Sequence, residues 1–65
     1  MEMDVIDTVI ADLVEVGDYI KFDGAVCAVK EKTEDGPERI VFISEDDRDI
    51  TCVWADPVEL YGYTS

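Results

Sequence analysis

The order of apolar and polar residues along the first half of the chain predicts a β-hairpin. Apolar and polar side chains alternate over residues 19–22, and the pair Asp23-Gly24 that follows is a strong two-residue hairpin signal. Residues 25–32 then form the returning strand, with Cys27 and Val29 on one face. We therefore expect two antiparallel strands joined by a tight turn.

The second half repeats this pattern of short strands and turns. Residues 39–44 include the apolar run Ile-Val-Phe-Ile, residues 49–54 alternate, and residues 59–63 form a short last strand. The connections are rich in turn-forming residues. We expect a loop at 33–37, a polar turn at 45–48, and a break at 55–58 with one 3₁₀ turn that begins near Pro57.

The N-terminal segment is less regular. Residues 5–11 are rich in β-branched side chains but alternate imperfectly, so a strand from about Thr8 competes with one helical turn from near Asp4, and we favour the strand. Residues 1–7 are acidic and open to fraying. Residues 11–18 are interpreted as a turn that points Leu13 and Val16 inward.

Together these segments predict one all-β domain over residues 1–65, with five short antiparallel strands and at most one helical turn. Composition agrees, because nine Val and six Ile outnumber two Leu and four Ala. A chain of this length buries roughly 60% of its unfolded surface, which leaves little room for a deep active site. The expected core is Val9, Leu13, Val16, Ile20, Phe22, Cys27, Val29, Ile40, Phe42, Ile50, Cys52 and Trp54.

Charge narrows the possible functions. The chain has 17 acidic and 5 basic residues, a net charge of −12 and no histidine. A Ser-His-Asp or Cys-His catalytic arrangement is therefore excluded, and we expect no enzyme and no cofactor. Cys27 and Cys52 form no Cys-x-x-Cys motif and cannot complete a zinc site without histidine, so they are interpreted as small buried apolar residues.

No secretory signal or membrane-spanning run is visible, so the sequence predicts a cytoplasmic protein that does not bind membranes.

A resemblance enters at Val14-Glu15-Val16-Gly17-Asp18-Tyr19-Ile20, where a Gly-Asp pair opens an alternating strand. With Phe22-Asp23-Gly24, Val29, an acidic hairpin and Asp56-Pro57, residues 11–63 resemble SH3-like barrels, including KOW-type modules. Many such small proteins are encoded by phages. The resemblance implies a five-stranded SH3-like barrel with a binding role and transfers no catalytic residue. KOW modules that bind nucleic acid have basic loops, whereas the loops here are acidic, so we expect no direct nucleic-acid binding.

Residues 45–49 form the densest carboxylate cluster. Their spacing lacks the glycine and the downstream bidentate glutamate of a calcium loop, so no metal site is predicted. Exposed aromatics of an SH3-like barrel can line a peptide groove. The candidate partner-binding residues are Glu34, Asp35, Glu45, Asp46, Asp47, Asp49, Tyr61 and Tyr63.

The leading hypothesis is a non-enzymatic acidic module that binds a protein with a basic surface, for example a phage accessory protein acting in the host cytoplasm. One alternative is a nucleic-acid mimic that inhibits a host DNA- or RNA-binding protein. The other is a structural component of an assembly, such as a homo-oligomer joined through strand edges.

Overall fold

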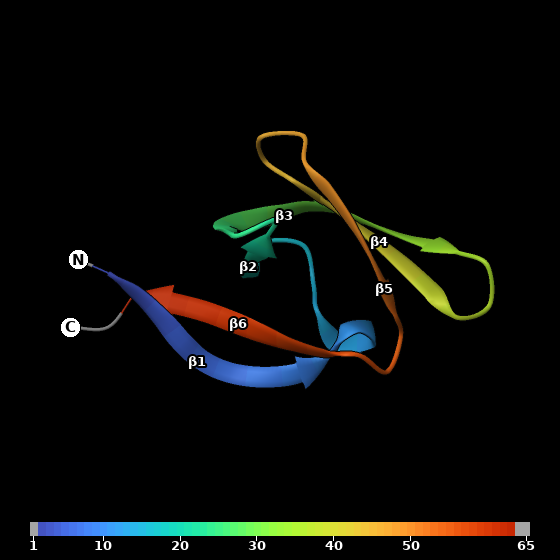
Figure 1. Cartoon of the computed structure of the whole chain (residues 1–65), viewed down its shortest axis with the longest axis horizontal. Helices are drawn as coiled ribbons and strands as arrows, with labels where there is room; N and C mark the ends of the chain where they lie inside the picture. The colour runs from blue at the N-terminus through green and yellow to red at the C-terminus, as the bar shows by residue number, and fades with distance from the viewer. Residues whose placement is uncertain (1, 64–65) are drawn as a thin grey trace.

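The computed structural model describes residues 2–63 and confirms an all-β, antiparallel chain. Within these residues one 3₁₀ turn is present, and it lies at Ala11–Leu13 rather than near Pro57. The elements in chain order are β1 (Met3–Ile10), η1 (Ala11–Leu13), β2 (Tyr19–Phe22), β3 (Ala25–Asp35), β4 (Arg39–Ser44), β5 (Asp49–Val53) and β6 (Pro57–Tyr63) (Figure 1).

The strands form one open sheet of six, in the order β1-β6-β2-β3-β4-β5, in place of the expected five-stranded barrel. Strand β3 is shared between two halves of the sheet. Residues 25–28 pair with β2, whereas the segment from Val29 to Asp35 pairs with β4, with a register shift between Val29 and Glu31. Figure 1 shows β1 and β6 together in one half and the β3–β4 hairpin extending from the other. Strands β1 and β5 are the two edges.

Strand β1 starts earlier than the sequence indicates. It pairs with β6 from Met3, opposite Tyr63, to Ile10, opposite Pro57, so the expected start at about Thr8 is wrong. Met1 lies outside the described residues. The register shifts between Val5 and Asp7, which is a bulge that contains one extra residue. The bulge explains why apolar and polar residues alternate imperfectly here.

The β2–β3 hairpin matches the prediction. Its two turn residues, Asp23 and Gly24, have φ angles of 50° and 89°. Positive φ at both central positions defines a type I′ turn, whose twist matches that of the flanking strands. The Asp-Gly pair is suited to this turn because glycine adopts positive φ freely and aspartate tolerates it better than most residues.

The β3–β4 hairpin is longer than predicted. Thr33, Glu34 and Asp35 were expected in a loop, but they belong to β3, and Glu34 and Asp35 pair with Ile40 and Arg39. The turn contracts to residues 36–38 around Gly36, whose φ is 79°. Local turn preference is outweighed because β4 offers a complete ladder of backbone hydrogen bonds.

The core lies on the inner face of the curved sheet. Its fully buried hydrophobic members are Ala11, Val14, Ile20, Phe22, Val29, Ile40 and Phe42. The partly buried residues packed against it are Val9, Cys27, Ile50, Cys52, Val58 and Leu60. Nine of the twelve expected core residues therefore belong to this cluster, and Leu13, Val16 and Trp54 do not.

The errors at Leu13 and Val16 have one cause. Their exposed fractions are 61% and 62%, whereas Ala11 and Val14 are fully buried. In a 3₁₀ turn, side chains three residues apart lie on the same side, so the turn at η1 brings Ala11 and Val14 inward together. The connection from β1 to β2 is thus anchored by different residues from those predicted.

Trp54 lies beyond the core because β5 ends at Val53. The chain then turns, and the Val53 and Asp56 backbone N–H groups donate respectively to the Asp56 carboxylate and the Val53 carbonyl, each at 2.9 Å. The 3₁₀ turn holds this β5–β6 connection: the N–H groups of Ala11 and Asp12 donate to the carbonyls of Asp56 and Trp54 at 2.8 and 3.0 Å. Trp54 is left 48% exposed.

Candidate binding site

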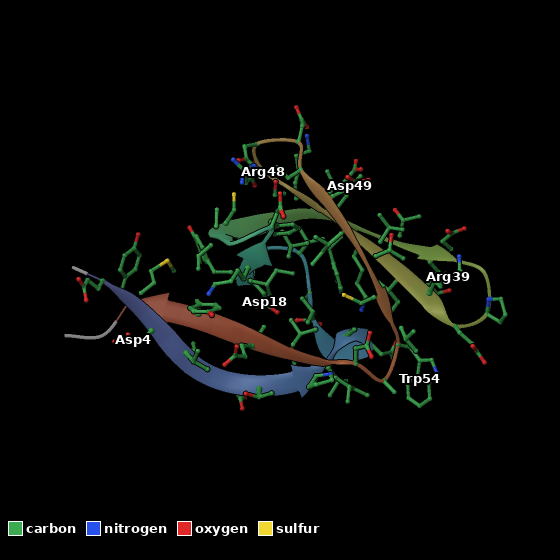
Figure 2. The ribbon with its side chains drawn as sticks, in the orientation of Figure 1. Asp4, Asp18, Arg39, Arg48, Asp49 and Trp54 are labelled. Atoms are coloured by element: carbon green, nitrogen blue, oxygen red, sulfur yellow. The ribbon has the colours of Figure 1, made fainter. Side chains whose placement is uncertain are left out.

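The predicted acidic residues separate into two groups at opposite ends of β4. Glu34 and Asp35 lie at the β3–β4 hairpin, whereas residues 45–47 and Asp49 lie at the β4–β5 turn. The six residues of β4 span about 20 Å between these ends. Figure 2 shows Arg39 at the first end and Arg48 and Asp49 at the other. The two groups therefore do not form one acidic surface.

Two of the acidic residues at the β4–β5 turn, Asp46 and Asp47, are paired with nearby basic side chains. Asp46 accepts a hydrogen bond from the Ser44 hydroxyl and pairs with Arg48 at 3.1 Å. Asp47 pairs with Lys30 at 2.7 Å. The hydrogen bond from Ser44, assisted by the charge of Arg48, lowers the pKa of Asp46, and the hydrogen bond to Asp47 raises the pKa of Lys30.

These contacts stabilise the conformation of the β4–β5 turn. Ser44 is fully buried, and its oxygen also accepts a hydrogen bond from the Arg48 backbone N–H at 2.9 Å. Within residues 2–63, no group of three acidic or cysteine side chains is placed to hold a metal ion.

Tyr61 and Tyr63 lie on β6, in the other half of the sheet. Leu60 packs against the core, so alternation along the strand places both tyrosines on the opposite face. Tyr61 lies opposite Val5 and Tyr19, and the ammonium of Lys21 is 5.8 Å from the centre of its ring, within cation–π range. Tyr63 is 63% exposed. The tyrosines form a surface separate from both acidic groups.

A hollow of about 230 Å³ lies at the end of the sheet that contains Trp54. Three segments meet there: η1, the β3–β4 hairpin and the turn after β5. Backbone hydrogen bonds join them, because the Asp12 N–H donates to the Trp54 carbonyl at 3.0 Å and the Trp54 N–H donates to the Glu38 carbonyl at 2.8 Å. The hollow is lined by Asp12, Glu34, Gly36, Pro37, Glu38, Arg39, Ile40 and Trp54.

Three of the four charged residues that line the hollow are acidic. Asp12, Glu34 and Glu38 contribute carboxylates, and Arg39 contributes one guanidinium. The Lys32 ammonium lies close by and donates to the Asp12 backbone carbonyl at 2.6 Å. In the described part of the chain, both side-chain ion pairs join other residues, so these three carboxylates have no ion-pair partner.

Sequence reasoning found only Glu34 among the three carboxylates of this hollow. Trp54 was assigned to the core because residues 49–54 alternate as a strand would. The Asp56-Pro57 turn signal that follows could have shown that the strand stops before the indole. Asp12 and Glu38 are distant from Trp54 in the chain and have no local pattern that would associate them with it.

Burial shields the thiol of Cys52. Desolvation, with a smaller contribution from the charge of Asp56, raises its pKa and favours the protonated form. Both Cys27 and Cys52 are free thiols. A protonated and partly buried thiol is a poor nucleophile, so Cys52 is best described as a packing residue.

Comparisons with known proteins found no matching family model, curated protein or solved structure. Among residues 2–63, no helix has the length and apolar character needed to cross a membrane. The function is therefore inferred from the charge and geometry of the surface.

Proposed function

We propose that the protein is a non-enzymatic interaction module that binds a protein partner through a basic surface of that partner. The observation that carries this proposal is the exposure of the carboxylates: every acidic residue except Asp18 is exposed. Only five basic residues oppose them, and two of these are already in ion pairs with acidic side chains. Such a surface attracts positively charged partners and increases the rate of encounter with them.

The same charge disfavours nucleic acid as the direct partner. Phosphate contacts depend on lysine and arginine, and the net charge of −12 repels a polyanion. The charge density also differs from that of DNA. The accessible surface of 4353 Å² carries one net charge per about 360 Å², against roughly 110 Å² for DNA taken as a cylinder. A basic protein surface therefore suits the molecule better than mimicry of a nucleic-acid backbone.

An SH3-like architecture is part of this proposal. Support comes from the curved antiparallel sheet and from a long β3 that is shared by its two halves. In small sheets of this kind, the loops lie at the surface and can bind partners, while the core remains buried.

Affinity capture from cell extract, followed by binding measurements on the purified captured proteins, tests the proposal. We expect proteins of high isoelectric point that bind at about 0.05 M NaCl and dissociate by about 0.5 M, because salt screens the attraction. Captured proteins that are acidic, or that bind equally at both salt concentrations, would contradict it. If the purified partner is displaced by DNA or RNA from the same surface, mimicry becomes the better explanation.

A further inference from the structure

We propose that the hollow at Trp54 binds an arginine side chain from an extended basic segment of the partner. This inference rests on the proposed function, because it assigns the basic group that the module would recognise. It goes further because it places the binding site at one end of the molecule and names arginine as the side chain bound there. Three features carry it: an available indole ring, carboxylates without ion-pair partners, and a hollow of limited size.

The indole ring is the first feature. Trp54 is 48% exposed although it is the largest apolar side chain of the protein, and it lines the hollow together with Ile40 and Pro37. Figure 2 shows it at the turn after β5, on the outside of the sheet end. Tryptophan presents the most favourable aromatic face to a cation, and arginine is the cation found most often in such contacts.

The carboxylates are the second feature. Asp12 comes from η1, whereas Glu34 and Glu38 come from the β3–β4 hairpin. Two segments that are distant in the sequence therefore supply the carboxylates of the hollow. An adjoining concavity shares residues 36–39 and adds Asp35. Against these four acidic residues stand Arg39 and Lys32, which leaves a local excess of negative charge. A guanidinium can stack on an indole while its N–H groups donate to carboxylates at the ring edge.

Size is the third feature. At about 230 Å³, the hollow beside the indole is smaller than the 300–1,000 Å³ usual for small-molecule sites. The adjoining concavity of about 380 Å³ is lined by residues 35–39 and not by Trp54. The hollow suits one side chain better than a whole cofactor. At the β4–β5 turn, Asp46 and Asp47 are already paired with Arg48 and Lys30, whereas neither of the ion pairs found among residues 2–63 involves the three carboxylates of the hollow.

Fluorescence provides a direct test because Trp54 is the single tryptophan of the chain. The probe is an acetylated, amidated pentapeptide of sequence Gly-Arg-Gly-Arg-Gly, titrated at low salt. Its control is the same peptide with citrulline, which has almost the same shape but no charge. We expect a saturable change in Trp54 emission and a shift of its indole N–H resonance, with binding at least about 5-fold weaker for citrulline. If both peptides bound equally, the positive charge would not be recognised, and the proposal would be overturned.

A pair of matched variants separates the hollow from general attraction. Glu38→Gln and Glu45→Gln remove the same charge from exposed positions at opposite ends of β4. We expect Glu38→Gln to weaken the arginine peptide about 3-fold or more and Glu45→Gln to change it by less than about 1.5-fold. Equal weakening would overturn the assignment to the hollow and leave the proposed function intact.

The ring is tested with Trp54→Leu, with peptide binding followed by NMR. The side chain is half exposed, so we expect the dispersed sheet resonances to persist while binding weakens about 3- to 10-fold. A folded variant that binds with unchanged affinity would overturn the role of the ring. If arginine peptides bind the hollow but affinity capture returns no basic protein, the site stands and the proposed function fails.

Discussion

Ser44 shows how one buried hydroxyl organises a strongly acidic turn. It lies at the end of β4, donates to Asp46 and accepts from the Arg48 backbone N–H. The two hydrogen bonds hold a carboxylate and a guanidinium side by side at the point where the chain reverses. A short polar residue is needed here, because an apolar side chain would leave the Arg48 N–H without this acceptor.

Replacing this hydroxyl should change how Asp46 titrates. In Ser44→Ala, we expect the pKa of Asp46 to rise toward its ordinary value of 3.8, because the hydrogen bond from Ser44 is the main cause of its lowering. A lowered pKa stabilises the fold above the ordinary pKa, and that contribution is lost as pH falls through the lowered value. Carboxyl chemical shifts followed against pH measure the change. An unchanged Asp46 titration in the folded variant would contradict it.

Val14 and Val16 form a matched pair that tests which residue anchors the β1–β2 connection. Val14→Ala removes two buried carbons and leaves a cavity, so we expect a loss of about 2 kcal/mol in the free energy of unfolding. Val16→Ala alters a side chain that is 62% exposed and should change it by less than about 0.5 kcal/mol. Urea unfolding measures both, and the reverse order would show that Val16 is the buried residue.

At the scale of elements, β1 contributes more to the stability of the sheet than its acidic sequence suggests. It pairs with β6 over its whole length, whereas within residues 2–63 β6 pairs with β2 at one position, where Tyr61 lies opposite Tyr19. Strand β1 therefore supplies most of the backbone hydrogen bonds of the last strand. Two strands from opposite ends of the chain depend on each other for their place in the sheet.

Deletion of residues 2–7 tests this dependence. We expect a large loss of stability and loss of slow amide exchange in β6, because residues 57–63 would be left with few backbone partners. In the intact protein, the paired β1 amides should exchange slowly. Fast exchange throughout residues 3–7, with a deletion variant as stable as the full chain, would instead support a frayed N-terminus.

The elements differ in how far local pattern determines them. Strands β2 and β4 match the expected residues 19–22 and 39–44, because each has a clear pattern and turn residues beside it. Residues 33–35 were misassigned because their place in β3 depends on a partner strand and not on their own turn preference. The bulge in β1 hides the alternation by which a strand is normally recognised.

At the scale of the whole molecule, repulsion between carboxylates opposes folding. The net charge is −12, and the two ion pairs found among residues 2–63 are exposed and contribute little. The hollow at Trp54 also belongs to this scale, since Asp12, Glu38 and Trp54 meet only after the sheet has formed. For this reason the sequence predicts an acidic surface but does not predict that three of its carboxylates line a hollow beside Trp54.

Salt should therefore stabilise the protein. We expect the melting temperature to rise as NaCl increases from about 0.02 M to about 0.5 M, because screening removes more repulsion than attraction. Circular dichroism during heating measures the shift. Matched KCl concentrations serve as the control, since screening depends on ionic strength alone. A melting temperature that falls with salt would show that ion pairs dominate.

The pairing of β1 with β6 has a consequence for synthesis on the ribosome. Met3 lies opposite Tyr63, so β1 cannot complete its pairing with β6 until nearly all of the described chain has been made. At roughly 5–20 residues per second, this delay lasts several seconds. Asp4 and Asp7 place two charges in this mostly apolar segment, and charges of this kind disfavour pairing between exposed strands. We therefore expect these two carboxylates to lower the tendency of the unpaired segment to aggregate.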